Sequence, residues 1–457
     1  MKNRIIAVLM AMAMLIVFPT SVFAENNAPG EPPSGEMGTP PEGGAPGEGG
    51  GFGGSTPPGG GTSDFEYTAA TEITEAAELS GETYSSDTAD ESSLIVNTDE
   101  DVTLTDITVS KTGSSSGGDS CNFYGLNAAL LAMGGGTVTI TGATVTSDAD
   151  GANGVFSYGG NGGQNGASGD GTTVVISDST ITTTGNGSGG IMTTGGGVTY
   201  ANNLTVETSG GSSAPIRTDR GGGTVVVDGG SYTSNGLGSP AIYSTADITV
   251  SNATLTSNLS EGVCIEGMNS ITLIDCDMTA NNTQCNGNAT FLDTIMIYQS
   301  MSGDADSGTS SFTMTGGSLT SLNGHMFHVT NTHAIITLTD VELVNEGSNI
   351  LLSVCDDGWS GASNIAELNA VGQVLTGTIL VGDNSTLMLS LTEGSSFEGI
   401  FSGEIINSKG DTISTEVGNV SVTLDETSTW TLTGDTYVTE FNGDLSQVDM
   451  NGYTLYV

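Results

Sequence analysis

Five residues in the middle of the chain combine charges and an aromatic ring at a spacing that could bring them together. Arg217, Tyr243 and Glu266 follow one another at nearly equal intervals, and Asp219 and Arg220 come shortly after the first. A guanidinium can donate two parallel hydrogen bonds to a carboxylate, and a tyrosine offers a flat ring face. These groups could bind a saccharide. The alternative is a surface ion-pair cluster that neutralises the only two arginines beyond residue 24.

Two loops place carboxylates at alternate positions beside glycine or other small residues. Asp148 and Asp150 form one pair, and Asp304 and Asp306 form the other. Calcium takes six to eight oxygen ligands, often from flexible loops of this kind. Neither string has the closing glutamate of an EF-hand. We therefore expect Ca²⁺ as a cofactor at these four residues, with ordinary solvated turns as the alternative.

The residues named above are part of a repetitive sequence. An eleven-residue pattern, seen in residues 224–234, recurs nine times along the chain, and this repeat should determine where those residues lie. Its second, fourth and ninth positions are apolar with few exceptions, which indicates strands with one buried face. Its sixth position admits only Gly, Asn or Asp, which tolerate a bend with positive φ. The nine units begin at Asp101, Thr137, Thr173, Val198, Thr224, Asp247, Ser270, Ser311 and Ile335.

A third short strand follows the bend in several units, for example at residues 214–217, 240–243 and 263–266. A single unit is too short to bury its apolar face alone, but stacked units share one core. We therefore expect an all-β fold, a right-handed parallel β-helix (solenoid) of about ten to twelve coils with terminal caps. The longest units carry loop insertions, where function on a solenoid is commonly located.

The outward face of the third strands should form one row of side chains about 4.8 Å apart. We assign to this row Leu131, Ser157, Thr193, Arg217, Tyr243, Glu266 and His328, and we place Cys264 on the inward face. Past Trp359 the Gly/Asn/Asp position is no longer recognisable in the sequence, so we expect the bend to be lost there.

The two ends of the chain differ from the repeats. Residues 1–24 have a basic start, an apolar run and a small-residue cleavage site, which is typical of a secretory signal peptide. Residues 25–64 are rich in Pro, Gly and Glu and predict a disordered linker. The β-helix domain should span 65–457, with an N-terminal cap at 65–93 and the last coil and C-terminal cap at 420–457. The expected location is extracellular, secreted or attached to the cell surface, with no membrane span in the mature chain.

The charge of the chain limits its partners. The formal net charge is −46, and removing the expected signal peptide, which has two basic and no acidic residues, makes it −48. Nucleic-acid binding needs a basic stripe, so this class of partner is excluded. The chain has five cysteines, so at least one of them cannot pair within the chain, and a disulfide framework is not expected to organise the fold. Their spacing also does not match a zinc site.

Four stretches carry a resemblance to a known group of proteins: residues 156–165, 216–223, 298–304 and 430–437. With them the chain resembles secreted right-handed parallel β-helix proteins of anaerobic Gram-positive bacteria, which are pectate-lyase-like and often described as adhesin-like or carbohydrate-binding. The resemblance implies a β-helix outside the cell and a glycan partner, whereas a shared fold alone does not imply shared chemistry.

Three functions follow as expectations. The first is a carbohydrate-binding or adhesin-like surface protein, assisted by Ca²⁺, whose ligand residues are Arg217, Asp219, Arg220, Tyr243 and Glu266. The second is a polysaccharide lyase or hydrolase acting on glycans that contain uronic acid, although the Gly-His-Gly and Arg-Ile-Lys signatures of polygalacturonases are absent. In a lyase, Arg217 would be the base. The third is a passive surface spacer.

Overall fold

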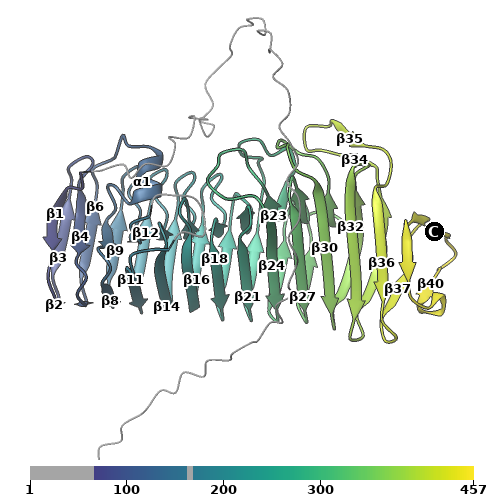
Figure 1. The fold of residues 1–457 in the computed structure, drawn as a ribbon, viewed down its shortest axis with the longest axis horizontal. Coiled ribbons are helices and arrows are strands. Elements are labelled where there is room, and N and C mark those ends of the chain that lie inside the picture. Colours follow the sequence, from purple (N-terminus) through teal and green to yellow (C-terminus); the bar gives the residue numbers. More distant parts are fainter. Residues whose placement is uncertain (1–65, 162–167) are drawn as a thin grey trace, which may run out of the picture. The chain divides into compact units, whose positions relative to one another are not determined.

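The chain folds as a stack of β-strand coils (Figure 1). The computed structural model describes residues 66–161 and 168–457. Nearly every element in these ranges is a strand, and successive coils pair in parallel. This confirms the expected all-β parallel β-helix. The expected signal peptide (1–24) and the expected linker (25–64) lie outside the described residues, so these two expectations stay predictions.

One face of the solenoid is a fifteen-stranded sheet, sheet A, which receives one strand from each coil. Its strands, in spatial order, are β1 (Ala69–Ile73), β4 (Ser92–Asn97), β7 (Leu130–Met133), β10 (Val155–Tyr158), β13 (Ile191–Thr194), β15 (Ile216–Thr218), β17 (Ile242–Ser244), β20 (Val263–Glu266), β23 (Asp293–Tyr298), β26 (His325–Thr330), β29 (Ile350–Val354), β31 (Val374–Val381), β33 (Ser396–Ser402), β37 (Thr429–Thr431) and β40 (Val448–Asp449). Fifteen strands exceed the ten to twelve coils expected, because residues near both ends also form strands that pair in register.

The remaining faces form a twenty-two-stranded sheet, sheet B, to which most coils contribute two strands. Its strands are β2 (Ala77–Ser80), β3 (Thr83–Ser86), β5 (Val102–Thr105), β6 (Thr108–Lys111), β8 (Thr137–Thr141), β9 (Thr144–Ser147), β11 (Thr173–Ser177), β12 (Thr180–Thr183), β14 (Gly197–Thr208), β16 (Gly223–Ser234), β18 (Asp247–Ser251), β19 (Thr254–Ser257), β21 (Ser270–Ile274), β22 (Asp277–Ala280), β24 (Thr309–Thr315), β25 (Ser318–Ser321), β27 (His333–Thr339), β28 (Glu342–Asn345), β30 (Asn364–Val371), β32 (Ser385–Thr392), β36 (Asn419–Leu424) and β39 (Glu440–Asn442).

The minor elements are found in insertions and near the C-terminal end. They are the helix α1 (Asp119–Tyr124), the antiparallel pair β34 (Ile405–Ile406) and β35 (Thr412–Ser414), the parallel pair β38 (Thr436–Tyr437) and β41 (Leu455–Tyr456), and the 3-10 turn η1 (Leu445–Gln447). In the part of the chain that the structure describes, no helix has the length and apolar character needed to cross a membrane.

The register between coils follows the eleven-residue pattern. Thr173 pairs with Thr137 on one side and with Val198 on the other, and Thr224 pairs with Val198 and Asp247. The same equivalence holds through all nine units. The repeat assigned from the sequence is therefore the physical coil, and each coil pairs only with the one before and the one after.

The bend position has the left-handed backbone conformation that its residue types predict. All nine residues have φ between 50° and 73°: Asp106, Gly142, Asp178, Asn203, Gly229, Asn252, Asp275, Gly316 and Asp340. The column also continues to Gly372 (φ 59°) and Glu393 (φ 57°). The expectation that the bend is lost past Trp359 is therefore wrong. The sequence pattern missed these bends for two reasons. A glutamate, Glu393, occupies one of them, and the strand that follows Gly372, β31, belongs to sheet A.

Gly229→Val tests the bend directly. Gly229 has φ 73°, and an added Cβ would meet no atom closer than 3.9 Å, so the cost is conformational rather than steric. A β-branched residue in this region is expected to lower the free energy of unfolding by about 1–3 kcal/mol. The measurement is the urea-unfolding midpoint, with Thr224→Val on the exposed strand surface as the matched control. A Gly229→Val midpoint equal to that of the control would refute the bend.

Candidate functional site

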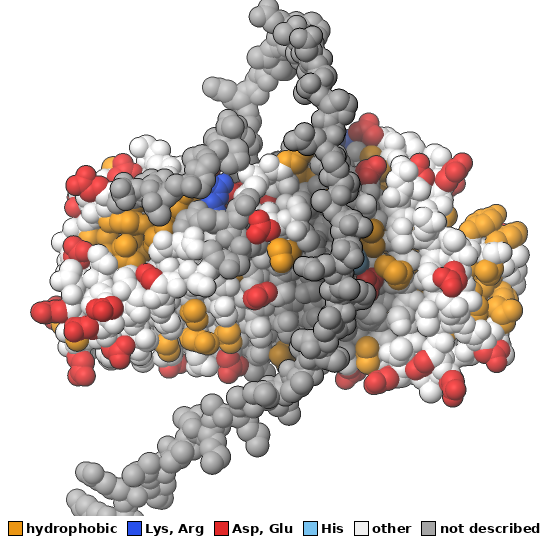
Figure 2. Space-filling model, in the orientation of Figure 1, with side chains coloured by type: hydrophobic (Ala, Val, Ile, Leu, Met, Phe, Trp, Pro, Cys, Tyr) orange, Lys and Arg blue, Asp and Glu red, His pale blue; other side chains and the backbone are white. Residues whose placement is uncertain are grey.

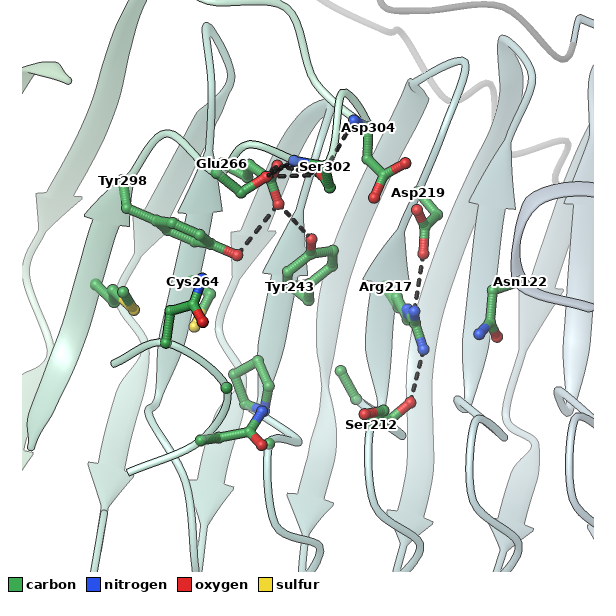
Figure 3. A pocket seen from close by; sticks show the side chains of 18 of the residues that line it. Asn122, Ser212, Arg217, Asp219, Tyr243, Cys264, Glu266, Tyr298, Ser302 and Asp304 are labelled. Atoms are coloured by element: carbon green, nitrogen blue, oxygen red, sulfur yellow. Dashed lines mark hydrogen bonds and ion pairs between the residues drawn. The ribbon is translucent and has the colours of Figure 1, made fainter. Parts of the chain in front are cut away.

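A cavity of about 510 Å³ opens on the outer face of sheet A, in the middle of the solenoid. Its floor comes from β15, β17, β20 and β23, and its walls come from α1, residues 286–289, residues 300–304 and Trp359 (Figure 3). The five expected ligand residues all line this cavity: Arg217, Asp219, Arg220, Tyr243 and Glu266. Asp304, which was expected to bind metal, lines it as well.

The floor brings these residues together in a register that differs from the expected one. Arg217 pairs with Tyr243 as expected, but Tyr243 pairs with Cys264. Glu266 lies two residues further along β20, on the same outward face, and pairs with Tyr298. The expected inward position of Cys264 is therefore wrong, because its side chain lines the cavity.

At two other positions of the expected outward row, the residue assigned from the sequence was wrong by one. Phe156 and Met192 occupy the row that continues to Arg217, whereas Ser157 and Thr193 point inward. A shift of one residue moves a side chain to the opposite face of a strand. The short third strands contain no restricted bend position, so the sequence alone did not fix their register.

Both arginines at the cavity are held by carboxylates. Arg217 Nη2 donates to Asp219 Oδ2 at 2.8 Å, and Arg217 Nη1 donates to the carbonyl oxygen of Ser212 at 2.6 Å. Arg220 Nη2 donates to Asp304 Oδ1 at 2.6 Å. The side chains of Arg217 and Asp219 are 7% and 5% exposed, so water screens this pair weakly. The positive charges of the site are thus already compensated within the protein.

Aromatic rings flank the guanidinium groups. The guanidinium carbon of Arg217 lies 5.6 Å from the centre of the Tyr243 ring, and that of Arg220 lies 4.2 Å from the centre of the Phe123 ring. Further along the floor, the rings of Tyr298 and Trp359 are 4.8 Å apart at an angle of 51°. Stacking on aromatic faces fixes the planes of the arginines and leaves apolar ring surface at both ends of the cavity.

Glu266 organises the tyrosine side of the cavity. Its Oε2 accepts hydrogen bonds from the hydroxyls of Tyr243 at 2.7 Å and Tyr298 at 3.1 Å. Its Oε1 accepts from the hydroxyls of Ser300 and, at 3.2 Å, Ser302 (Figure 3). Burial raises the pKa of Glu266, and the hydroxyl donors lower it again in part. Because four donors already occupy this carboxylate, its main effect is to position the two tyrosines and the 300–304 loop.

Asp219 is a buried acid of the cavity whose pKa is raised on folding. Burial raises its pKa to about 6, although the positive charge of Arg217 acts in the opposite direction. Asp304 adds a further increase by repulsion. A carboxyl group with this pKa can hold a proton under mildly acidic conditions.

The carboxylate of Asp357 connects two of the cavity walls. Asp357 Oδ1 accepts hydrogen bonds from the backbone N of Thr290 at 2.8 Å and from its hydroxyl at 2.6 Å. Thr290 follows the 286–289 wall, and Trp359 comes two residues after Asp357. Behind Asp357, His328 Nε2 lies 3.3 Å from Asp357 Oδ2, and His328 Nδ1 lies 2.8 Å from Ser353 Oγ.

This arrangement of Ser353, His328 and Asp357 is similar to a hydrolytic triad, but its environment argues against that chemistry. The side chains of His328 and Asp357 are 0% exposed, and Ser353 is also fully buried. A nucleophile must reach a substrate, and this serine does not. The three residues therefore support the walls of the cavity.

Three of the four residues expected to bind calcium, Asp148, Asp150 and Asp304, have other side-chain partners. Asp304 pairs with Arg220, and the side chains of Asp148 and Asp150 accept hydrogen bonds from Thr184 Oγ1 at 2.5 Å and from the backbone N of Asn186 at 2.7 Å. Within residues 66–161 and 168–457, no group of three or more His, Cys, Asp or Glu is gathered so that it could hold a metal ion. These residues as arranged do not fit a calcium site, and Ca²⁺ binding stays a prediction.

That prediction is open to a direct measurement. A ligand that binds only the folded state raises its stability by mass action. If calcium binds, a few millimolar CaCl₂ should raise the melting temperature more than NaCl of equal ionic strength. The variant carrying both Asp148→Asn and Asp150→Asn is the control for the first loop. Equal shifts from the two salts would reduce the effect to screening.

Several residues of the cavity were not singled out from the sequence. Asn122 and Phe123 come from α1, and Tyr298 and Trp359 come from other segments around sheet A. The unusual length of the units that begin at Asp101 and Ser270 did mark the insertions that carry the α1 wall and the 286–304 walls. Inside an insertion, however, no repeat indicates where a side chain points.

Negative charge predominates on the visible surface of the solenoid. Figure 2 shows carboxylates spread over the visible face of the described part of the solenoid, with very little exposed Lys or Arg there.

Comparison of the chain with family models, with curated proteins and with solved structures finds no match. The function must therefore be argued from the cavity itself.

Proposed function

We propose that the chain is a secreted or cell-surface carbohydrate-binding protein that holds a saccharide in the cavity above β15, β17 and β20. The observation that carries the proposal is the combination of aromatic faces and fixed polar groups around one cavity of about 510 Å³. Ligand sites are commonly about 300–1,000 Å³ in volume and place a few polar groups among apolar walls. Sugars need this combination because they have apolar C–H faces and polar edges.

The same cavity supports a second candidate, hydrolysis of a glycosidic bond. Asp219 is the observation that favours it, since a buried carboxyl with a pKa of about 6 can act as a general acid near neutral pH. The lyase candidate is less well supported. Its base would be Arg217, and the ion pair with Asp219 stabilises the charged guanidinium, which has no free electron pair to accept a proton.

Trp359→Ala tests glycan binding without touching the ion pairs. Loss of one aromatic wall should weaken retention on an immobilised or gel-embedded polysaccharide about tenfold, equivalent to ~1.4 kcal/mol. The matched control is Tyr200→Ala, which removes a tyrosine that is 48% exposed on sheet B, away from the cavity. Reducing ends and unsaturated products are assayed in the same samples to detect hydrolase or lyase activity.

The outcomes separate the three functions. Retention that depends on Trp359 without new products supports binding, and new products support an enzyme. Absence of retention on every neutral and acidic polysaccharide, together with absence of products, would leave the passive spacer as the better account.

A further inference from the structure

The charge balance of the cavity restricts the chemistry of its ligand. Among the described residues, two guanidinium groups line it, and both are paired with carboxylates of the protein. Five carboxyl groups of the described chain line the same cavity: Asp119, Asp219, Glu261, Glu266 and Asp304. Acidic groups are therefore in excess even after both ion pairs are formed. A ligand carboxylate would have to separate an arginine from its aspartate and would then face the remaining acids.

The hydrogen-bonding groups point to a ligand that both donates and accepts. Arg217 uses two of its five N–H donors in the bonds to Ser212 and Asp219, and its Nε is buried with no partner among the described residues. This end of the cavity needs acceptors. The carboxyl group of Asp119, which lies in the α1 wall, can accept hydrogen bonds from a ligand, whereas Glu261 already accepts one from the Ser260 hydroxyl. A sugar hydroxyl supplies both, whereas an ammonium group supplies no acceptor and a carboxylate supplies no donor.

We infer that the ligand of this cavity is a neutral saccharide rather than a polymer of uronic acids. The inference rests on the proposed function and narrows it. The apolar floor made by Cys264 and Met296, which pack with Tyr243 and Tyr298, suits the C–H face of a hexose ring. The hydroxyl edge of such a ring can then reach the guanidinium of Arg217. The carboxylates of Asp219 and Asp304 keep the arginines oriented and exclude anionic sugars by repulsion.

The test compares three sets of oligosaccharides of equal length: neutral, uronate-containing and amino-sugar-containing. Isothermal titration at about 0.15 M salt is expected to give the tightest binding for a neutral set, with uronate binding at least about tenfold weaker. Uronate binding as tight as neutral binding, in the presence of EDTA, would overturn the inference while leaving the proposed function intact. Tightest binding of the amino sugars would overturn it as well. Failure of all three sets to bind would instead contradict the proposed function.

Asp304→Asn independently tests whether the cavity carboxylates exclude anionic sugars. The Asp304 side chain is 18% exposed, so the substitution should leave the fold intact, and it removes the carboxylate that compensates Arg220. Affinity for the uronate set should rise about tenfold relative to the neutral set, because an uncompensated guanidinium becomes available. Glu342→Gln, at an exposed position of sheet B, removes one negative charge elsewhere and should leave the ratio unchanged. An equal ratio in both variants would show that Asp304 does not select against anions.

Discussion

Trp430→Ala is expected to lower the free energy of unfolding by about 3–5 kcal/mol. Trp430 is fully buried, and its ring contacts those of Phe397, Phe401 and Phe441 at centroid distances of 6.0, 5.4 and 6.4 Å. Its indole N–H donates to the carbonyl oxygen of Gly399 at 3.1 Å. Truncation would therefore leave a large cavity between the last coils together with an unpaired carbonyl group.

Urea unfolding measures this effect, with Val374→Ala as the control. Val374 is 65% exposed, and its truncation should change the unfolding free energy by less than about 0.5 kcal/mol. Because solenoid coils can unfold in segments, hydrogen exchange should show the loss concentrated in β33, β36, β37 and β39. A Trp430→Ala midpoint equal to that of the control would mean that the C-terminal coils do not share this core.

Stability should fall as the pH rises from about 4 toward 8, which is the second large effect. Burial raises the pKa of Asp219 from 3.8 to about 6 and raises that of Asp293 well above 3.8. A carboxyl whose pKa is raised on folding stabilises fully below its unfolded pKa, and this contribution is lost as the pH rises through the folded pKa. For Asp219 alone the loss between about pH 4 and 7 is of the order of 3 kcal/mol.

The lowered pKa of Asp357 makes the protein less stable at low pH. Burial acts to raise the pKa of Asp357, but its hydrogen bonds and the nearby His328 together lower it below the usual value. The contribution of Asp357 to stability is therefore present above the unfolded pKa and is lost as the pH falls through the lower folded pKa. The melting temperature is therefore expected to have its maximum under mildly acidic conditions. Repulsion among the acidic residues of a chain with a formal charge of −46 adds to the decline at higher pH.

Asp293→Asn isolates one source of this dependence. Both carboxyl oxygens of Asp293 are buried without a hydrogen-bond partner among the described residues, and the side chain lies close enough to Glu261 and Asp357 to be repelled by them. The amide has nearly the same shape and no charge. The variant should match the wild type near pH 4 and melt at a higher temperature near pH 8. A pH profile parallel to that of the wild type would contradict this role.

The backbone of the fold was predictable because one position in each coil admits few residue types. In the nine repeats the left-handed conformation is reached only by Gly, Asn or Asp at the sixth position, and this regularity defined the register of sheet B from Asp106 to Asp340. The strands of sheet A lack such a position and are often very short. Buried polar residues such as Ser157 and Thr193 then made the inward and outward faces indistinguishable.

The candidate site was predictable only on its floor. Arg217 and Tyr243 were placed side by side because parallel coils bring equivalent positions together. The pairing of Arg220 with Asp304 joins residues 84 positions apart in sequence, through an insertion that has no repeat to define its path. The same is true of Trp359. Loops of this kind are fixed by tertiary contacts, which the local sequence does not encode.

The strictly neighbour-to-neighbour pairing of coils has an evolutionary consequence. Duplication or deletion of one whole unit would preserve every remaining strand pair, so the gene can lengthen or shorten without a new fold. The cavity floor, however, draws on the consecutive strands β15, β17, β20 and β23. A duplication between Arg217 and Tyr243 would move them apart by one additional spacing of about 4.8 Å and divide the cavity. Variation in coil number among related proteins should therefore fall outside residues 119–359, which carry the floor and the walls of the cavity.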